Sequence, residues 1–428
     1  MDESDHYYEK GKLVIRDDKI FDLGPTALIE NKGKIINMEK KLVLPGFVNT
    51  HTHSPSSLFR GMADDLKLMN WLYTLIWPAE KHLTKEIVYW GAALSFLEFL
   101  RTGVTTFADQ YFFSEAIGLA VKKSGLRGFI APTVFSHPSP ETDDPLQAAV
   151  DFIEKYKGKE ETTRVYPCIG PHAPYSCNDH DLKQVAEVAA KYKVMIHTHI
   201  SETMDENEKI VAETGMTPTR YLEEMGILEQ RVLAAHCIHL TAEDINILSE
   251  RKVNVSYNPV SNLKLVSGIM PLRELFQKNV TVSLGTDGAQ SNNSLDLLRD
   301  LKTGVLIQKN FNQDATFFNT REALRMITIE GGRALGMADQ IGSLEKGKKA
   351  DLIALDMDDV NLNPIHRSSL NNIYSAVVYS ASGHNVADVI VDGDILMKDK
   401  VFLKVSKEEI LERAREGSHF IMKKAGFI

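Results

Sequence analysis

LPGFVNTHTH, residues 44–53, is the stretch at which the pattern of this chain changes. Before it, residues 12–20 and 33–46 predict short β-strands separated by a turn at residues 22–25, which together indicate a small β unit. From residue 45 onward, short β-rich runs alternate with segments of helical length. Strands that alternate with helices in this way predict parallel βαβ units.

Eight β-rich runs carry this alternation, and amphipathic segments such as 181–193 and 241–252 separate most of them. Eight such units within roughly 250 residues have the size of a closed barrel. We therefore predict an α/β protein in which residues 46–340 form a (β/α)8 barrel of the TIM type. The eight runs are residues 44–53, 103–110, 126–135, 164–174, 193–202, 231–240, 253–262 and 280–289.

The chain becomes β-rich again after about residue 340. Residues 342–356 and 386–400 predict strands, and the DGD sequence at 392–394 predicts a hairpin turn. Residues 407–425 predict a final helix. We expect residues 1–45 and 341–428 to pack together as a small β-sandwich domain beside the barrel, with the C-terminal helix belonging to it.

Composition limits the classes of partner. The chain has 49 Lys and Arg against 58 Asp and Glu, a net charge of −9, which argues against a nucleic-acid or anionic-membrane partner. The sequence contains no run of 18 apolar residues, so it predicts no membrane span. The acidic N-terminal stretch is unlike a secretory signal, and three cysteines, an odd number, suit a reducing compartment. We expect a cytoplasmic protein with a small-molecule substrate, and a homo-oligomer is left open.

Histidines and one aspartate stand where the predicted barrel strands end, the position of active sites in such barrels. His51 and His53 are two apart in an extended strand, so both imidazoles face the same side. His199 ends the fifth run and Asp287 the eighth. These four side chains offer three nitrogens and one oxygen, a set suited to a divalent ion such as zinc or iron.

Three more groups lie near this set. Glu202 comes three residues after His199, close enough to reach a water on the metal without binding the metal, while His172 and His236 end the fourth and sixth runs. Each histidine alone has a simpler explanation as a packed strand-end residue, and His197 can act merely by fixing the tautomer of a neighbour. Six of these ionisable groups, all except Glu202, stand at the ends of predicted strands, and this common position favours one shared site. We assign the remaining candidates His82, His137 and His180 to loops or helices.

Six stretches give the chain a resemblance to a known family: LPGFVNTHTH, GPHAPYSC, IHTHISET, AAHCIHL, NPVSNLKL and LGTDGAQSNN. They resemble the amidohydrolase superfamily, and within it the branch of 5′-methylthioadenosine/S-adenosylhomocysteine deaminases and 5′-deoxyadenosine deaminases. The likeness runs from about residue 10 to residue 400 and includes every predicted barrel strand.

The resemblance implies a role for each candidate. His51, His53, His199 and Asp287 would bind one divalent metal per chain, zinc first, with iron, nickel or manganese as alternatives. Glu202, His236 and Asp287 would be catalytic, and Trp71, Glu80 and His172, together with Glu202, would bind a nucleoside. For Trp71 ordinary packing is an equal alternative, and for Glu80 the alternative is a solvated helix residue.

The chemistry of adenine deamination needs these groups. A bound metal lowers the pKa of its water to about 7 and so supplies a nucleophile. Glu202 can take a proton from that water and pass it to the ring nitrogen, and His236 can polarise the attacking oxygen. Asp287 can relay a proton to the departing ammonia. Glu80 offers two acceptor oxygens to the vicinal hydroxyls of a ribose.

Absent residues narrow the prediction further. No lysine follows the apolar part of the fourth run, where two-metal relatives carry a bridging lysine, so we expect one metal. No HxE…PCxxC signature occurs, which excludes the deaminase fold that acts on cytidine and nucleic acids. Relatives that accept S-adenosylhomocysteine carry arginines after the third strand; here APTVFSHPSPETDDP has none and three acidic residues, Glu141, Asp143 and Asp144. Arg60 or Lys264 is the alternative cation.

We therefore predict hydrolytic deamination of a 5′-modified adenosine, such as 5′-methylthioadenosine, 5′-deoxyadenosine, adenosine or, less readily, S-adenosylhomocysteine. The alternatives are a guanine-type deaminase or an s-triazine hydrolase, whose substrates have no ribose for Glu80 to bind. A catalytically inactive binding scaffold is a further alternative, but such a protein is expected to have lost ligands, and all six groups are present.

Overall fold

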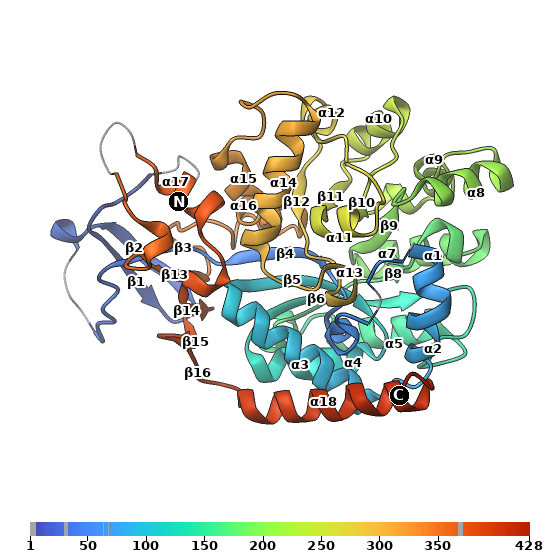
Figure 1. Ribbon diagram of the computed structural model, residues 1–428, viewed down its shortest axis with the longest axis horizontal. Helices are drawn as coiled ribbons and strands as arrows, with labels where there is room; N and C mark the ends of the chain where they lie inside the picture. Colours follow the sequence, from blue (N-terminus) through green and yellow to red (C-terminus); the bar gives the residue numbers. More distant parts are fainter. Residues whose placement is uncertain (1–5, 30–32, 63, 67, 367–370) are drawn as a thin grey trace.

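A computed structural model of the chain describes residues 6–29, 33–62, 64–66, 68–366 and 371–428, and shows a barrel beside a smaller β-rich unit (Figure 1). Each of the eight predicted runs contains a strand, so the predicted (β/α)8 fold is confirmed. The fourth barrel position is occupied by two short strands. The barrel strands are β4 (Phe47–Thr52), β5 (Val104–Tyr111), β6 (Arg127–Val134), β7 (Val165–Pro167) with β8 (Gly170–Pro171), β9 (Ile196–Ile200), β10 (Val232–His236), β11 (Asn254–Tyr257) and β12 (Val282–Leu284).

The barrel consists of two parallel sheets that meet at two seams. One sheet has the order β4-β5-β6-β7, with β8 paired to β6, and the other has the order β12-β11-β10-β9. A bridge between Ile169 and Ile196 joins them at one seam. At the other seam the Asp287 N–H donates to the His51 carbonyl oxygen (3.0 Å). The second seam therefore places two predicted metal ligands, His51 in β4 and Asp287 just after β12, next to each other.

Helices surround the barrel, and local capping explains where several begin. The Asn178 side chain accepts from the Asp181 N–H at the start of α7, and Thr241 with Asp244 forms a capping box at the start of α10. The main barrel helices are α3 (Lys85–Thr102), α4 (Ser114–Ser124), α5 (Pro145–Tyr156), α7 (Asp179–Tyr192), α8 (Met204–Thr214), α9 (Pro218–Glu224), α10 (Ala242–Glu250), α12 (Leu272–Gln277), α14 (Leu297–Phe311), α15 (Thr320–Met326) and α16 (Ile329–Ala334).

Shorter helices lie in the connections between these elements. Three of them follow one another before α3, and the middle one, η3, is a π-helix. The short helices near the barrel are α1 (Leu68–Trp71), η3 (Leu72–Ile76), α2 (Trp77–Glu80), α6 (Glu160–Thr163), α11 (Pro259–Lys264) and α13 (Ala289–Asn292). As expected, His82 and His137 lie in loops and His180 lies in α7. No helix within the described ranges is long and apolar enough to cross a membrane.

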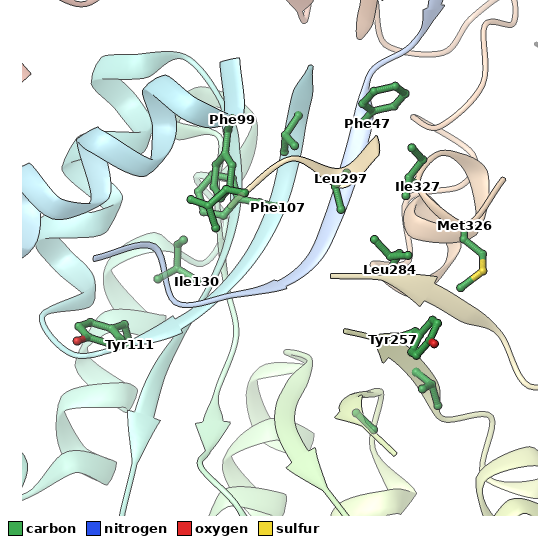
Figure 2. Close-up of a cluster of buried hydrophobic side chains, with 14 of the residues drawn as sticks. Phe47, Phe99, Phe107, Tyr111, Ile130, Tyr257, Leu284, Leu297, Met326 and Ile327 are labelled. Atoms are coloured by element: carbon green, nitrogen blue, oxygen red, sulfur yellow. The ribbon is translucent and has the colours of Figure 1, made fainter. Parts of the chain in front are cut away.

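The barrel strands are buried on both faces, as parallel strands between helices are expected to be. Phe107 and Ile130 belong to the large core between strands and helices (Figure 2). Their neighbours Ala108 and Phe129 belong to a separate core with Leu335. Side chains alternate between the two faces of a strand, so the same strands supply both cores and hold their carboxyl ends rigidly in place.

The small unit is a β-sandwich made from both ends of the chain. A five-stranded sheet has the order β16-β15-β14-β13-β3, and a two-stranded hairpin, β1-β2, packs on it through a core that includes Ile20, Leu352 and Ile390. The predicted DGD hairpin is confirmed, with its turn at Asp392 and Gly393. The strands are β1 (Gly11–Arg16), β2 (Lys19–Pro25), β3 (Lys41–Pro45), β13 (Leu352–Asp356), β14 (Val386–Val391), β15 (Asp394–Lys398) and β16 (Val401–Phe402).

The N-terminal hairpin differs from the prediction. Residues 12–20 do not form one strand, because the chain turns at Asp17 and Asp18, where Asp17 has φ 56°, and the segment at 22–25 lies inside β2. Aspartate tolerates this left-handed conformation better than most residues, which allows a two-residue turn. Only β3 forms within the second predicted stretch.

Two contacts tie the sandwich and the C-terminal helix to the barrel. Arg127, at the start of β6, is fully buried and pairs with Asp351 and Asp392 of the small unit. The predicted final helix is confirmed as α18 (Lys407–Lys424), and it runs along α3 (Figure 1). Its Ser418 hydroxyl donates to the Leu58 carbonyl (2.8 Å), which lies in the short helix Ser54–Phe59 after β4.

Candidate metal centre and active site

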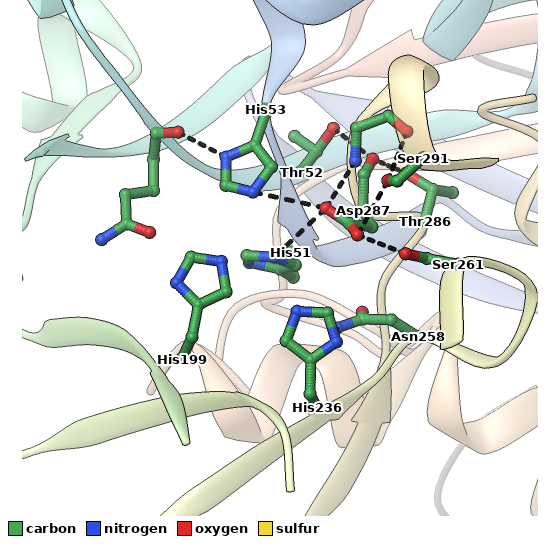
Figure 3. A network of polar contacts seen from close by, with 12 residues as sticks. His51, Thr52, His53, His199, His236, Asn258, Ser261, Thr286, Asp287 and Ser291 are labelled. Atoms are coloured by element: carbon green, nitrogen blue, oxygen red, sulfur yellow. Dashed lines mark hydrogen bonds and ion pairs between the residues drawn. The ribbon is translucent and has the colours of Figure 1, made fainter. Parts of the chain in front are cut away.

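Three imidazoles converge at the carboxyl ends of β4 and β9, and each presents its Nε2 atom to a common space (Figure 3). His53 Nδ1–H donates to the Gln110 carbonyl (2.7 Å), and His199 Nδ1–H donates to the His172 carbonyl (2.6 Å). His51 Nδ1 lies 2.8 Å from His197 Nε2. Because Nδ1 is engaged in each ring, Nε2 is the atom that remains available to a metal.

Asp287 completes the set from the loop after β12. Its Oδ1 lies 3.5 Å from His51 Nε2 and 3.3 Å from His53 Nε2. The Ser261 and Ser291 hydroxyls donate to its Oδ2 (2.5 and 2.8 Å), and these contacts orient the carboxylate. The strand end needs a glycine close by, because a Cβ on Gly285 would lie 2.7 Å from His51 Cβ.

The residues present fit a divalent metal. His51 Nε2 is buried and has no hydrogen-bond partner among the described residues, which is costly unless a ligand occupies the space in front of it. Burial lowers the pKa of His199 well below its usual value and neighbouring imidazoles lower it further, so the ring is neutral and keeps a lone pair. Three imidazole nitrogens and one carboxylate oxygen are the donor set of a mononuclear zinc site.

His236, at the end of β10, is held in one orientation. The Asn262 side-chain amide donates to its Nδ1 (2.8 Å), which leaves the proton on Nε2. Nε2 lies 3.7 Å from Glu202 Oε2. His236 thus presents an N–H donor to the space beside the three imidazoles.

Glu202 lies in the turn after β9 and is buried. Burial raises the pKa of its carboxyl group well above the usual value, and the charges of Asp287 and Glu206 raise it further. The Glu206 carboxylate accepts the Glu202 N–H (2.7 Å) and the Ser201 N–H (3.3 Å), so a second buried glutamate holds the turn in place. A carboxyl group that resists ionisation can deliver a proton as well as accept one.

A cleft of about 680 Å³, part of it open to solvent, leads away from this centre. Glu80, Trp71 and His172 all line it, so the structure brings the three predicted substrate residues to the same cavity as Glu202 and His236. Tyr111 donates to Glu80 Oε1 (2.6 Å), and burial raises the pKa of Glu80 to about 7 although this hydrogen bond lowers it. The short helices α1, η3 and α2 supply one wall.

Trp71 lies in α1 and His172 follows β8, and the two have different surroundings in the cleft. The Trp71 indole is 3% exposed, and its Nε1–H has no hydrogen-bond partner among the described residues. His172 Nδ1 lies 3.0 Å from the Ser176 hydroxyl, and its ring is 4.7 Å from that of Phe135. Burial lowers the pKa of His172 to about 3, so the ring is neutral.

The acidic segment after β6 does not reach the cleft. Glu141 accepts the Phe113 N–H, and Asp144 caps α5 by accepting the Gln147 N–H (3.0 Å). The two alternative cations are paired elsewhere, Arg60 with Glu98 and Lys264 with Asp64 (2.7 Å). Among the described residues that line the cleft there is no lysine or arginine.

Several functional neighbours were not identified from the sequence. Gln110 positions His53 through its carbonyl, and its side-chain amide donates to the carbonyls of Gly170 (3.0 Å) and His197 (3.2 Å). Ser261 and Asn262 lie at the end of the seventh run, and Ser291 follows the eighth. Their position shortly after a strand was the one feature of the sequence that could have indicated a role in the site. Their partners lie far away in sequence, which is why no local pattern assigns their roles.

Comparison with known proteins agrees with this geometry. The profile of the amidohydrolase family matches residues 42–396. The chain is 41% identical to the 5′-deoxyadenosine deaminase of Methanocaldococcus jannaschii, over 94% of this chain and 95% of that protein. It is 40% identical to the 5-methylthioadenosine/S-adenosylhomocysteine deaminase of Thermodesulfovibrio yellowstonii, over 97% and 94%.

A solved structure extends the likeness to three dimensions. The zinc-bound adenosine deaminase from Xanthomonas campestris superposes with a TM-score of 0.92 at 31% identity, over 97% of this chain and 94% of that one. The family profile covers the whole barrel, and at both ends of its match it reaches into the five-stranded sheet of the sandwich. The chain therefore belongs to the amidohydrolase family.

Proposed function

We propose that the protein hydrolytically deaminates 5′-modified adenine nucleosides, converting each to the inosine analogue and ammonia, with one zinc ion per chain. The observation that carries the proposal is the shared cleft: His51, His53, His199 and Asp287 converge at one place, and the buried carboxyl of Glu80 lines the same cavity. Deaminases of this substrate class among the relatives support it.

The three imidazoles and Asp287 would hold the metal, which when bound activates water for attack at neutral pH. Glu202 accepts a proton from the attacking water and donates it to ring nitrogen N1, which makes C6 electrophilic. His236 Nε2–H donates a hydrogen bond to the attacking oxygen, the role to which its contact with Asn262 suits it. Asp287 carries a proton toward the amino group, which leaves as ammonia.

The remaining residues would bind the nucleoside. Glu80 accepts hydrogen bonds from the 2′- and 3′-hydroxyls, and Tyr111 keeps its carboxylate in position. The neutral His172 and the Trp71 indole N–H, which has no hydrogen-bond partner among the described residues, offer further polar contacts in the cleft. A free guanine or a triazine has no ribose hydroxyls for Glu80 to bind, which favours a nucleoside substrate.

The experiment is a screen for ammonia release across adenosine, 5′-methylthioadenosine, 5′-deoxyadenosine, S-adenosylhomocysteine, guanine and a chlorotriazine, with metal content measured on the same sample. Turnover of adenine nucleosides alone supports the proposal. Turnover of guanine or a triazine in their place would contradict it, and failure of every substrate with a full complement of zinc would favour a binding scaffold.

Three further expectations form part of the proposal. The catalytic barrel comprises residues 46–340, and residues 1–45 with 341–428 form the small domain. A cytoplasmic location is supported by three buried cysteines, none of which forms a disulfide. Self-association into a homo-oligomer is tested by light scattering on the purified protein.

A further inference from the structure

Gln290 lies in the wall of the cleft and belongs neither to the metal-ligand set nor to the proposed ribose site. It belongs to the one-turn helix α13 (Ala289–Asn292), three residues after the metal-ligand position Asp287, and is 8% exposed. Its backbone carbonyl accepts a hydrogen bond from Lys264 Nζ (3.5 Å).

The side-chain oxygen of Gln290 has no hydrogen-bond partner among the described residues. This atom, Oε1, is also buried. A buried acceptor left unpaired costs free energy, and such a group points to a ligand that completes it. The side chain folds back over Gly288, because a Cβ at that position would overlap the carboxamide. The chain thus brings a donor and an acceptor next to the end of the cleft where Asp287 lies.

The chemistry of adenine matches such a group. When C6 faces the nucleophile and N1 faces Glu202, the edge on the other side of C6 carries the amino group, a donor, and N7, an acceptor. A glutamine carboxamide binds this pair with two hydrogen bonds, Oε1 accepting from the amino group and Nε2 donating to N7. Guanine carries acceptors at both places, O6 and N7, so the same carboxamide cannot satisfy both of its bonds with guanine.

We propose that Gln290 determines base specificity by binding the amino group and N7 of adenine; this inference rests on the proposed function. The competing explanation is that Gln290 only packs over Gly288 and supports the Asp287 loop. The two differ in what N7 contributes. A packing role affects all substrates alike, whereas a binding role affects substrates that have N7 more strongly than those that keep only the amino group.

The test compares 5′-methylthioadenosine with its 7-deaza analogue, in which carbon replaces N7. The variants are Gln290→Met, which keeps volume and removes both polar atoms, and Gln277→Met, a matched control at an exposed position of α12. For Gln290→Met we expect kcat/KM on 5′-methylthioadenosine to fall about five- to hundredfold, the range for one such bidentate pair. The 7-deaza analogue should lose much less, and Gln277→Met should match the wild type.

Binding provides a readout that is independent of turnover. In the Glu202→Gln background, the affinity ratio between the two nucleosides should be large with Gln290 and close to one with Gln290→Met. An unchanged ratio, or equal losses on both nucleosides with a lower Tm, would overturn the inference and leave deamination intact. If the wild type deaminates no adenine nucleoside, the proposed function fails and this inference fails with it.

Discussion

Glu80 gives a test that links the proposed ribose site to stability. Its carboxyl group is buried, and Tyr111 is the hydrogen-bond donor that contacts it (2.6 Å). Replacing it with glutamine keeps the shape and an acceptor for Tyr111 but removes the ionisable group. We expect Glu80→Gln to be a poorer catalyst and, at neutral to alkaline pH, a more stable protein.

The magnitude follows from the pKa of the buried group. Burial raises the pKa of Glu80 from 4.5 to about 7, so the folded protein holds this proton more tightly than the unfolded chain does. Its contribution to stability is therefore full below pH 4.5 and is lost as pH rises toward 7. The two pKa values differ by about 2.5, and one unit corresponds to about 1.4 kcal/mol. Ionised Glu80 thus costs the folded state about 3 kcal/mol above pH 7.

The assay measures the difference in unfolding free energy, or in Tm at one scan rate, between Glu80→Gln and the wild type from pH 5 to 8.5. The difference should grow in favour of the variant as pH rises and level off above pH 7. Glu274→Gln, at an exposed position of α12, is the matched control and should show no such trend. Comparison with the wild type cancels the titration of all other groups.

Catalytic efficiency should fall when Glu80 is replaced, in contrast to the gain in stability. Hydrogen bonds to a charged acceptor contribute roughly 1.5–3 kcal/mol, or about ten- to hundredfold. Glu80→Ala or a 2′,3′-dideoxy substrate should each lower kcat/KM at least about tenfold, and the combination should add little. A pH-independent stability difference would refute the buried ionisation, and additive catalytic losses would show that Glu80 does not contact the diol.

Three other predictions concern the metal, the proton shuttle and the 5′ substituent. Elemental analysis should find one tightly held divalent ion per chain, lost together with activity in His199→Ala; two ions, or activity without metal, would exclude a mononuclear site. Glu202→Gln should lower turnover by about 10²–10⁴ while binding persists, and a loss below tenfold would assign the shuttle to another residue. Because the described lining of the cleft holds no cation, 5′-methylthioadenosine should be preferred over S-adenosylhomocysteine when catalytic efficiencies are compared at two salt concentrations. Equal efficiencies would point to an arginine or lysine from a neighbouring subunit.

The barrel strands and the candidate ligand positions could be predicted because each strand, together with the polar residue at its end, forms one short continuous stretch of sequence. An apolar run followed by His51, His199 or Asp287 identifies both a buried strand and a polar strand end. Parallel strands of a closed barrel present those ends on one face, so the fold prediction also brought the candidate ligands together. The N-terminal hairpin could not be placed in the same way, because two adjacent aspartates interrupt an otherwise continuous strand pattern.

The acidic segment shows where local composition misleads. Glu141 and Asp144 suggest a negative cleft mouth, but each is used by nearby backbone, one accepting from Phe113 and the other capping α5. Whether a charged side chain faces a cleft or satisfies a neighbouring N–H depends on the path of the loop, which composition does not specify.

The alternation of strands and helices, the candidate metal ligands at the strand ends and the family resemblance could all be predicted from the amino-acid sequence. Which nitrogen each imidazole presents follows from the folded arrangement, because it depends on partners such as Gln110 and His197. These partners lie 57 and 146 residues away along the chain from the histidines they orient. The folded arrangement also buries Glu80 against Tyr111 and leaves Gln290 Oε1 without a hydrogen-bond partner among the described residues. Periodicity is a property of neighbouring residues, whereas tautomer, desolvation and an unpaired acceptor are properties of the space that distant segments enclose.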